Sequence, residues 1–418
     1  MKKQTVSMLA LMALWWCGSV WAQDQIEFTP SISVSETYDD NVFLSERNER
    51  SDYITAVTPS LTLNVLTDKT KLGMNYRPTF VWYSDFSENN TTRHQGTVSW
   101  DQQLTQYLSL NLTDTYLRSE DPLEDPEDVD AERRTRNEYW TNRGRASVGF
   151  AFGPENRLDV GYARNDRENT DPTLNDIKTH APFMSLTYWF DVKNGMRLNY
   201  TYRDATYSLD DDFTGHEPRV QYFRRFSPQS VGFLEYRYTT RDFDGRTEDF
   251  VVHSGSVGLN HAFSPEYSIR ASAGYFMRVY EVSENTYGPT FDLFLTKAFA
   301  KGSITIGGEG GWEDVYLRRG TDTRAFRKYY GASAQGTFRI LERLSLVAGA
   351  SYRWSKDDQN IEIKNLRGNC GLRWSFMRYA SLALQYYYAD RNDDILRDSY
   401  TSNRVMLTLN VSKAFKWL

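Results

Sequence analysis

Beyond its first 22 residues, the sequence lacks any apolar run long enough to cross a membrane as a helix, which takes about 20 residues. Its mean hydropathy is −0.63, so membrane helices are excluded. Cysteine is almost absent as well. Of the two cysteines, Cys17 lies in the leader and Cys370 lies beyond it. The mature chain therefore cannot form an internal disulfide.

Histidine is scarce and scattered. The five histidines are His94, His180, His216, His253 and His261, and they do not have the spacing of a metal site. Nucleophilic catalysis needs a base that a third group orients, and the sequence offers no such set. We therefore expect no enzyme activity and no cofactor. His253 and His261 fall on the apolar face of one predicted strand, near its two ends, which favours an interfacial position.

An excess of basic residues is also missing. The formal net charge is −6, and removal of Lys2 and Lys3 with the leader would take it to −8. This acidic balance argues against nucleic acid as a partner. Aromatic residues, by contrast, make up 15 % of the chain, with 28 Tyr and 11 Trp. That enrichment fits the interfacial girdles of a membrane barrel better than it fits a soluble core.

The N-terminus has the three parts of a secretory signal peptide. Lys2 and Lys3 give a basic start, residues 6–16 are apolar, and residues 20–22 end the segment in a small-x-small pattern. We predict a signal peptide over 1–22, cleaved after Ala22, and one barrel domain over 23–418. Lipidation of Cys17 is disfavoured, because Trp16 precedes it where lipoprotein processing needs a small residue.

The stretch 70–86 shows the pattern on which the rest of the chain is built. Its even positions are mainly apolar, as at Tyr76, Phe80 and Trp82, and its odd positions are mainly polar, as at Arg77 and Asp85. Successive side chains of a strand point to opposite faces. One face of this strand is therefore apolar over the roughly 9 to 11 residues that cross a bilayer.

The same alternation recurs from residue 32 to the C-terminus, and the connections alternate between short and long. The short ones include 67–69, 153–156 and 227–229, and the long ones are charged. Short periplasmic turns and longer extracellular loops are typical of outer-membrane barrels. We therefore predict an all-β fold: a single transmembrane antiparallel up-and-down barrel of about 20 strands, with 18 as the alternative. Polar lumen residues alternating with apolar ones explain the low hydropathy.

The polar positions of the predicted strands, which would face the lumen, are rich in arginine. We therefore expect a charged lumen that attracts carboxylated or sulfated sugars. The simpler alternative is that these arginines pair with acids on neighbouring strands. The predicted pore-lining residues are Arg77, Asp85, Arg143, Arg145, Arg197, Arg203, Arg237, Arg270, Arg278, Asp292, Arg353, Arg367 and Arg373.

Two other features concern the loops and one strand. Eight acids lie from Glu120 to Glu132, but without the ligand spacing and turn glycine of a calcium loop, so we expect a solvated or lipopolysaccharide-facing loop. The loop 118–137 is also the candidate for narrowing the lumen.

The glycine pairs at 307–308 and 310–311 lie in a predicted strand, where glycine marks a bend or a close contact.

The run 35–44, SETYDDNVFL, followed by SDYIT at 51–55 and TPSL at 58–61, resembles the opening of a family of outer-membrane β-barrel porins that accompany exopolysaccharide or capsule secretion systems. The resemblance implies a barrel without enzymatic activity in the outer membrane of a Gram-negative bacterium, through which a polymer passes. It also implies a periplasmic polysaccharide-export protein and an inner-membrane synthesis complex as partners.

Three functions compete at this point. The first is a channel for exopolysaccharide or capsule export, the second a general diffusion porin for small solutes, and the third a structural or adhesive surface barrel. About 20 strands would enclose a wide lumen, since 16 to 18 already leave an aqueous channel. Outer-membrane lipids and lipopolysaccharide are expected partners of all three. The barrel-assembly machinery is another, because aromatic residues close the final amphipathic strand at Phe415 and Trp417.

Overall fold

The computed structural model describes residues 25–124, 136–314, 326–358, 360–394 and 399–417. The predicted signal peptide lies outside these residues. In the described ranges the chain forms 21 strands and one short 3₁₀ turn, Ser87–Asn89. The strands are β1 Gln25–Asp39, β2 Asp52–Leu66, β3 Thr70–Tyr83, β4 Thr91–Gln103, β5 Leu108–Ser119, β6 Tyr139–Ala151, β7 Arg157–Asn169, β8 Ile177–Trp189, β9 Asn194–Tyr207, β10 Phe213–Ser227, β11 Ser230–Phe243, β12 Phe250–Ser264, β13 Tyr267–Tyr280, β14 Thr286–Phe299, β15 Gly302–Asp314, β16 Phe326–Leu341, β17 Leu344–Asp357, β18 Glu362–Trp374, β19 Ala380–Asp393, β20 Tyr400–Ser412 and β21 Phe415–Trp417.

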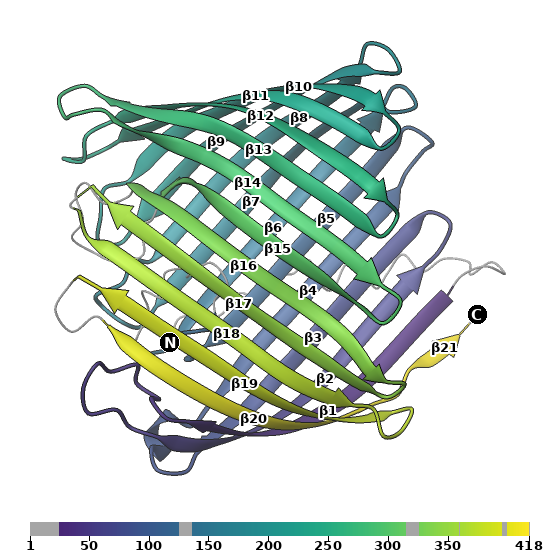
Figure 1. Ribbon diagram of the computed structural model, residues 1–418, viewed down its shortest axis with the longest axis vertical. Helices are drawn as coiled ribbons and strands as arrows, with labels where there is room; N and C mark the ends of the chain where they lie inside the picture. The colour runs from purple at the N-terminus through teal and green to yellow at the C-terminus, as the bar shows by residue number, and fades with distance from the viewer. Residues whose placement is uncertain (1–24, 125–135, 315–325, 359, 395–398, 418) are drawn as a thin grey trace.

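Strands β1 to β20 form a closed antiparallel barrel (Figure 1). Each strand pairs with its neighbours in sequence, and β1 closes the barrel by pairing with β20 from Ser31↔Ser412 to Asp39↔Arg404. The short strand β21 continues this pairing along the other end of β1, with Phe28 opposite Phe415. The predicted barrel of about 20 strands is confirmed.

The two ends of the barrel differ in the length of their connections. Turns such as 228–229 and 265–266 join strands at one end, whereas connections such as 40–51 and 170–176 lie at the other. Outer-membrane barrels keep their short turns in the periplasm. The short-turn end is therefore the periplasmic end, and the long-loop end is the extracellular end.

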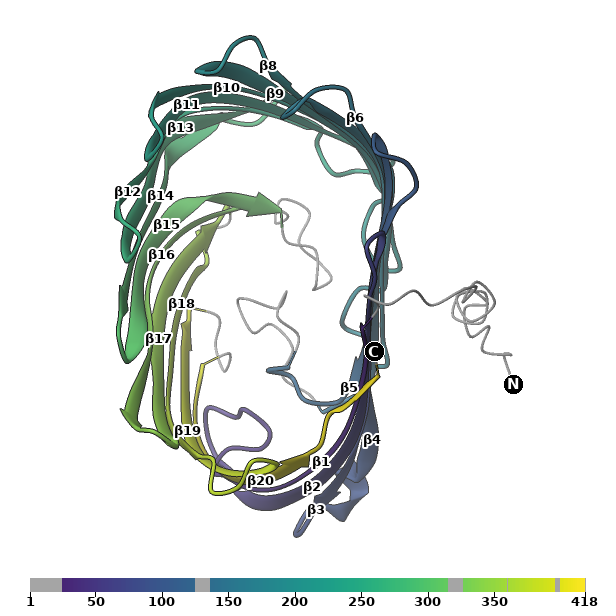
Figure 2. The ribbon, with the colours of Figure 1, turned by 90° about the vertical axis from the view of Figure 1, so that its right-hand side faces the viewer.

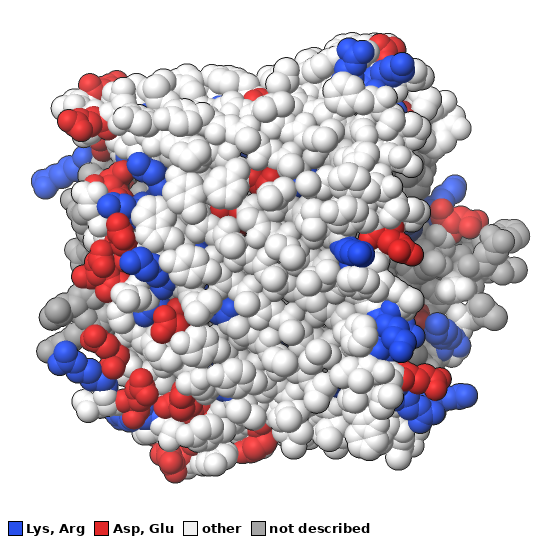
Figure 3. All heavy atoms as spheres, in the orientation of Figure 1, with Lys and Arg blue, Asp and Glu red and all other residues white. Residues whose placement is uncertain are grey.

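The outer face of the barrel is a band of exposed apolar side chains. On β3 the exposed residues are Tyr76, Phe80 and Trp82, all on one parity, and β13 shows the same with Tyr275 and Met277. Figure 3 shows this face as a mostly uncharged band between two charged margins. Within the described ranges, no helix is long and apolar enough to cross a membrane.

Candidate channel lumen

On each strand, the side chains that alternate with the exposed apolar residues face the inside of the barrel. On β3, Arg77, Thr79 and Val81 line an internal cavity of about 1090 Å³. On β9 and β11, Arg197 and Arg237 line a second cavity of about 840 Å³. Figure 2 shows how the strands enclose this interior. Strand alternation therefore separates a lipid face from a lumen face.

Twelve of the thirteen predicted pore-lining residues lie on the inward parity of their strands, and whether they line a conducting pore stays a prediction. They are Arg77 on β3, Arg143 and Arg145 on β6, Arg197 and Arg203 on β9, Arg237 on β11, Arg270 and Arg278 on β13, Asp292 on β14, Arg353 on β17, and Arg367 and Arg373 on β18. Asp85 differs. It is exposed in a bend beyond the end of β3 at Tyr83, where alternation no longer assigns a face.

Positive charge is concentrated on the inner wall formed by β6 to β11. The inward positions of these six strands carry ten arginines and three acids. The arginines are Arg143, Arg145, Arg157, Arg167, Arg197, Arg203, Arg219, Arg225, Arg237 and Arg241, and the acids are Asp159, Glu217 and Glu235. We call this surface the arginine wall.

Two of the three acids of the arginine wall are shared between arginines, and Asp159 pairs with Arg157 at 2.8 Å. Glu217 Oε1 lies 3.1 Å from Arg203 Nε and 2.8 Å from Arg241 Nη2. Glu235 contacts Arg219, and its Oε1 lies 3.7 Å from Arg237 Nη2. Because one carboxylate serves two guanidinium groups in each case, the wall keeps a net positive charge.

Two arginines of this wall rest on aromatic rings instead of acids. The Arg145 guanidinium lies 3.6 Å from the centre of the Phe183 ring, and Phe183 fits over Gly161, where a Cβ would overlap the ring. Glycine therefore makes room for the ring, and the ring supports the cation. Arg197 lies 6.0 Å from the Phe223 ring in the same way, with Gly195 beneath the ring.

Elsewhere some inward arginines pair with acids, as the simpler alternative expects, whereas Arg77 contacts the amide of Gln95. Arg270 Nε lies 2.9 Å from Asp292 Oδ1 across β13 and β14. Arg278 is buried, contacts Asp358 and lies 3.8 Å from the Phe326 ring. These arginines add little net charge to the lumen, which leaves the arginine wall as its positive sector.

The sector from β15 through β20 to β2 carries no net charge by comparison, because its inward positions hold seven arginines and seven acids. Its cavity-lining side chains are mainly hydroxyls, amides and small residues: Ser33, Ser35, Thr37, Thr58, Ser303, Thr305, Ser333, Gln335, Thr337, Gly349, Ser351 and Asn369. The lumen thus has one positive side and one hydroxyl-rich side.

The hairpin of β15 and β16 leaves the barrel wall and bends into the lumen. β15 pairs with β14 only as far as Phe291↔Gly310, although it stays paired with β16 to Asp314↔Phe326. Figure 2 shows these strands entering the interior. The predicted bend at the glycine pairs lies at this point, and Pro289, which has no N–H to donate, lies in the part of β14 that is left without β15.

The bent hairpin is seated against the inner side of β11 to β13. Asp314 Oδ2 lies 2.6 Å from Arg241 Nη2, and Trp312 Nε1 donates to Ser254 Oγ at 3.2 Å. Phe326 is buried between the rings of Phe250 and Phe276. A strand hairpin therefore narrows the extracellular half of the lumen.

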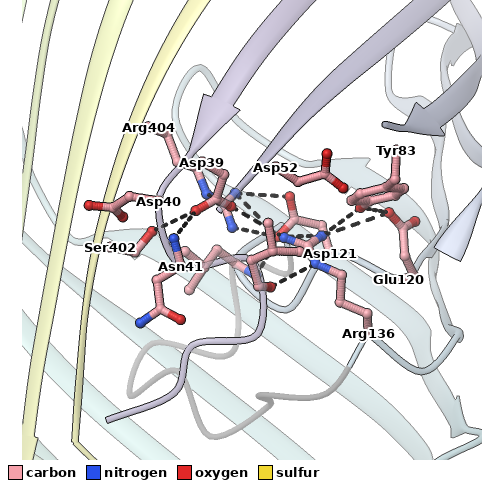
Figure 4. Close-up of polar contacts among 12 residues, drawn as sticks. Asp39, Asp40, Asn41, Asp52, Tyr83, Glu120, Asp121, Arg136, Ser402 and Arg404 are labelled. Atoms are coloured by element: carbon pink, nitrogen blue, oxygen red, sulfur yellow. Dashed lines mark hydrogen bonds and ion pairs between the residues drawn. The ribbon is translucent and has the colours of Figure 1, made fainter. Parts of the chain in front are cut away.

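On another side of the lumen, a buried ion pair joins the first and last strands of the wall. Asp39 of β1 is fully buried, and its Oδ2 lies 2.9 Å from Arg404 Nε of β20 (Figure 4). Asp121, which follows β5, places Oδ2 3.0 Å from Arg404 Nη1. The segment after β5 is thereby fixed to the seam of the barrel.

Arg136, at the other end of the same loop, extends this network. Its Nε donates to the Val42 carbonyl and its Nη1 to the Tyr83 hydroxyl, both at 2.8 Å, and its Nη2 is 3.4 Å from Asp39 Oδ2. The Tyr83 hydroxyl in turn donates to Glu120 at 2.8 Å. Both described ends of the predicted constricting loop lie inside the barrel, and 125–135 lie outside the described residues.

The expectation of a solvated acidic loop is wrong for its first acids. Glu120 is 2 % exposed, because Arg93 and Arg136 compensate its charge. Burial alone would raise the pKa of Asp121, but Arg404, Arg136 and Arg93 hold it well below its usual range. Burial raises the pKa of Glu124, and the Arg93 guanidinium, 3.9 Å away, only partly opposes this.

The comparisons with known proteins place this barrel in the outer membrane. The family model "Putative beta-barrel porin 2" matches residues 27–160. The siderophore receptor PirA from Pseudomonas aeruginosa has a TM-score of 0.52 and 9 % identity, over 92 % of this chain and 80 % of that one. The alcaligin outer-membrane receptor FauA from Bordetella pertussis has 0.51 and 11 %, over 92 % and 76 %. Among curated proteins, none matches this sequence.

At such identities the solved structures bear on the fold alone, and the family model covers the strands from β1 into β7. The chain is a porin-like β-barrel of the Gram-negative outer membrane. The predicted resemblance is confirmed to that extent, and the link with polysaccharide secretion stays a prediction.

Proposed function

We propose that this outer-membrane barrel is an anion-preferring channel that takes part in the export of an acidic exopolysaccharide or capsule polymer. The observation that carries the proposal is the arginine wall, with ten arginines against three acids. Guanidinium groups stay charged at every physiological pH and can bind carboxylate or sulfate through two parallel hydrogen bonds. A polymer with acidic groups would find successive binding partners along this wall.

The neutral sector supports a sugar as the passing solute. Ser303, Thr305, Ser333 and Gln335 offer hydroxyl and amide groups that both donate and accept hydrogen bonds. A hydrated saccharide can exchange such bonds with the wall at little cost, directly or through water. The two sides of the lumen thus match the two kinds of group on an acidic sugar, its carboxylates and its hydroxyls.

A channel for small anions is the second candidate. The observation that favours it is the narrowing of the lumen by the β15–β16 hairpin and by the described ends of the loop after β5. A narrow passage suits small carboxylates without any conformational change. An exported polymer would have to thread the same passage or displace the hairpin.

Export would also require partners on the periplasmic side. We propose that a periplasmic polysaccharide-export protein delivers the polymer from an inner-membrane synthesis complex to the short-turn end. At that end the exposed Glu155, in the turn after β6, forms an ion pair with the partly buried Arg225 of β10. Substitutions at these two residues give a first site at which to test delivery.

Channel block separates the two candidates. Purified barrel in a planar bilayer receives oligogalacturonate, an acidic sugar oligomer, or neutral maltooligosaccharide of equal length on the periplasmic side. We expect reversible block by the acidic oligomer alone, and loss of that block in the Arg145→Gln/Arg197→Gln variant. Small carboxylates that permeate while both oligomers leave the current unchanged would favour the small-anion channel. Equal block by both oligomers would contradict an acidic substrate.

Deletion of the gene tests the biological role. The export proposal expects loss of surface polysaccharide from the deletant, with restoration by the wild-type gene. Intact surface polysaccharide in the deletant would contradict the export role and leave anion preference to be judged from the bilayer experiment.

A further inference from the structure

The lumen sector from β15 through β20 to β2 carries no net charge, but its charges are separated along the barrel axis. Six of its seven inward acids lie in the extracellular halves of their strands, as Asp39 does, 2.9 Å from Arg404. The seventh, Glu27, lies near the periplasmic end of β1, 2.9 Å from Lys416. Within the described part of the chain, the periplasmic halves of β15 to β19 therefore hold no inward acid.

Two arginines lie at this periplasmic end. Arg339 of β16 and Arg373 of β18 are both inward and exposed, and Ser345 of β17 lies directly opposite each of them. Since neighbouring strands are about 4.8 Å apart, the backbones of the two arginines are about 10 Å apart. Ala383 lies opposite Arg373 on the other side. Small side chains therefore leave space around the two guanidinium groups.

The short turns beside these arginines add positive charge. Those between β14 and β19 carry Lys301, Arg343 and Arg378 against one acid, Glu342, whereas those between β2 and β13 carry two cations and four acids. The three turn cations are exposed, and the backbone N–H of Arg339 donates to the Lys301 carbonyl at 2.6 Å. The turn cations thus adjoin the inward row. We call Lys301, Arg339, Arg343, Arg373 and Arg378 the basic mouth.

The charges of the basic mouth are not neutralised by the protein. Among the residues that the structure describes, none of its five cations forms an ion pair with an acid. Arg343 donates to a backbone carbonyl, that of Phe376, at 3.4 Å. An anion that binds here therefore displaces no protein carboxylate, whereas Arg203 and Arg241 of the arginine wall already share Glu217. Exposed guanidinium groups bind carboxylate or sulfate through two parallel hydrogen bonds.

The basic mouth leads into the hydroxyl-rich side of the lumen. Thr337 and Gln335 precede Arg339 by two and four residues on the inward face of β16, and Asn369 precedes Arg373 by four on β18. All three line the cavity of about 1090 Å³. Their hydroxyl and amide groups can exchange hydrogen bonds with sugar hydroxyls. A saccharide whose acidic groups bind at the mouth can therefore place its hydroxyls against this lining, which favours a sugar chain over the acidic face of a protein.

We propose that the basic mouth binds an acidic saccharide chain as it enters the barrel from the periplasm. This inference rests on the proposed export function and adds the site of first binding. Arg339 and Arg373 bind carboxylate or sulfate groups of the chain, and the turn cations attract it to the opening. Because the acids of this sector lie at the extracellular end, the mouth favours entry of an acidic chain from the periplasm over entry from outside.

Channel block from each side of a planar bilayer tests the site in the full-length barrel. Oligogalacturonate is added at low salt to the periplasmic or to the extracellular side, and the intervals between blocking events give the association rate. In Arg339→Gln/Arg373→Gln we expect the association rate from the periplasmic side to fall about tenfold, a factor within the range of electrostatic steering. The association rate from the extracellular side and the duration of each block should stay as in the wild type.

The matched control is Lys297→Gln/Lys413→Gln, which removes two cations at the same end of the barrel. Their ammonium groups lie over the exposed rings of Phe299 and Phe415 on the lipid face, so the association rate should equal that of the wild type. Heat-modifiable migration on gels shows whether each variant is folded, and Arg373→Gln alone replaces the mouth variant if that protein does not fold. An unchanged association rate in the folded mouth variant, or an equal fall in the control, would overturn the proposal.

Equilibrium binding separates this site from the proposed function. Fluorescent oligogalacturonate is titrated against the barrel in nanodiscs, in the Arg145→Gln/Arg197→Gln background that weakens the arginine wall. Binding that is lost when Arg339→Gln/Arg373→Gln is added supports the mouth even if the wild-type channel is never blocked, a result that would contradict only the export function. No binding, or equal binding of neutral maltooligosaccharide, would overturn the site. Unchanged binding together with loss of surface polysaccharide in cells that carry the mouth variant would also overturn it and assign the mouth to a protein partner.

Discussion

The contacts that hold the β15–β16 hairpin inside the lumen lead to a testable prediction about the width of the channel. Phe326 is 1 % exposed and lies between Phe250 and Phe276, with the Arg278 guanidinium 3.8 Å from its ring. These contacts, together with the Arg241–Asp314 ion pair, hold the hairpin inside the lumen, against the inner side of β11 to β13. Phe326→Ala removes most of the apolar part of the seat and leaves the wall strands unchanged.

The size of the effect follows from burial. Truncation of a fully buried phenylalanine to alanine costs about 3 to 5 kcal/mol. Since each 1.4 kcal/mol is about a factor of ten, the balance between seated and released hairpin should shift by about a hundredfold or more. Released, the hairpin no longer crosses the lumen, and single-channel conductance in a planar bilayer should rise.

Phe338→Ala is the matched control, because Phe338 lies on the same strand but is exposed on the lipid face. It makes the same chemical change without touching the seat, so its conductance should equal that of the wild type. Equal conductance in Phe326→Ala, folded and inserted, would refute the role of the hairpin as the constriction. A rise in both variants would point to general loosening of the barrel.

Three further predictions concern the wall and the loop. A charge at Phe80, on the lipid face of β3, should impair assembly, costing roughly 2 to 4 kcal/mol near the midplane for Arg or Lys, whereas Arg77→Ala on the lumen face should fold. Unfolding in lipid vesicles measures the stability of both variants, and similar behaviour of the two would show that the lipid and lumen faces of β3 are wrongly assigned. Gly161→Val should lower the yield of folded barrel, because a Cβ at this position would overlap the Phe183 ring and the Ala146 carbonyl. Gly96→Val is the control, since a Cβ there meets only one atom at 3.9 Å, and similar yields of the two variants would count against the packing of the ring on Gly161. The raised pKa of Glu124 means that the folded loop favours the protonated carboxyl, so the stabilisation of the folded loop by this group is fully present below the unfolded pKa of about 4.3 and declines as the pH rises through the higher folded pKa. Glu124→Gln should therefore remove this pH dependence from the protection of the loop in hydrogen exchange, and an unchanged pH profile would contradict the assignment.

The wall of the barrel could be predicted from sequence because its rule is local. Alternation on each strand, as in residues 70–83, gives the lipid face and the lumen face without knowledge of neighbours. The strand number, the inward parity of twelve predicted residues and the short and long connections all follow from this repeat. Asp85 was misassigned to the strand pattern because β3 ends at Tyr83, and strand ends depend on loop contacts.

The interior structures depend on contacts between distant residues, which alternation cannot reveal. Asp39, Asp121 and Arg404 meet only because β1 closes against β20, so the burial of Glu120 beside this network was missed. The glycine pairs of β15 did signal a bend, but its direction into the lumen depends on the seat formed by Phe250 and Phe276.

The reversal potential of the wild-type channel in a potassium chloride gradient tests the central claim most directly. A net positive arginine wall predicts preference for chloride over potassium, and a preference that weakens in the Arg145→Gln/Arg197→Gln variant. Preference for potassium in the wild type, or the same reversal potential in both proteins, would contradict the account.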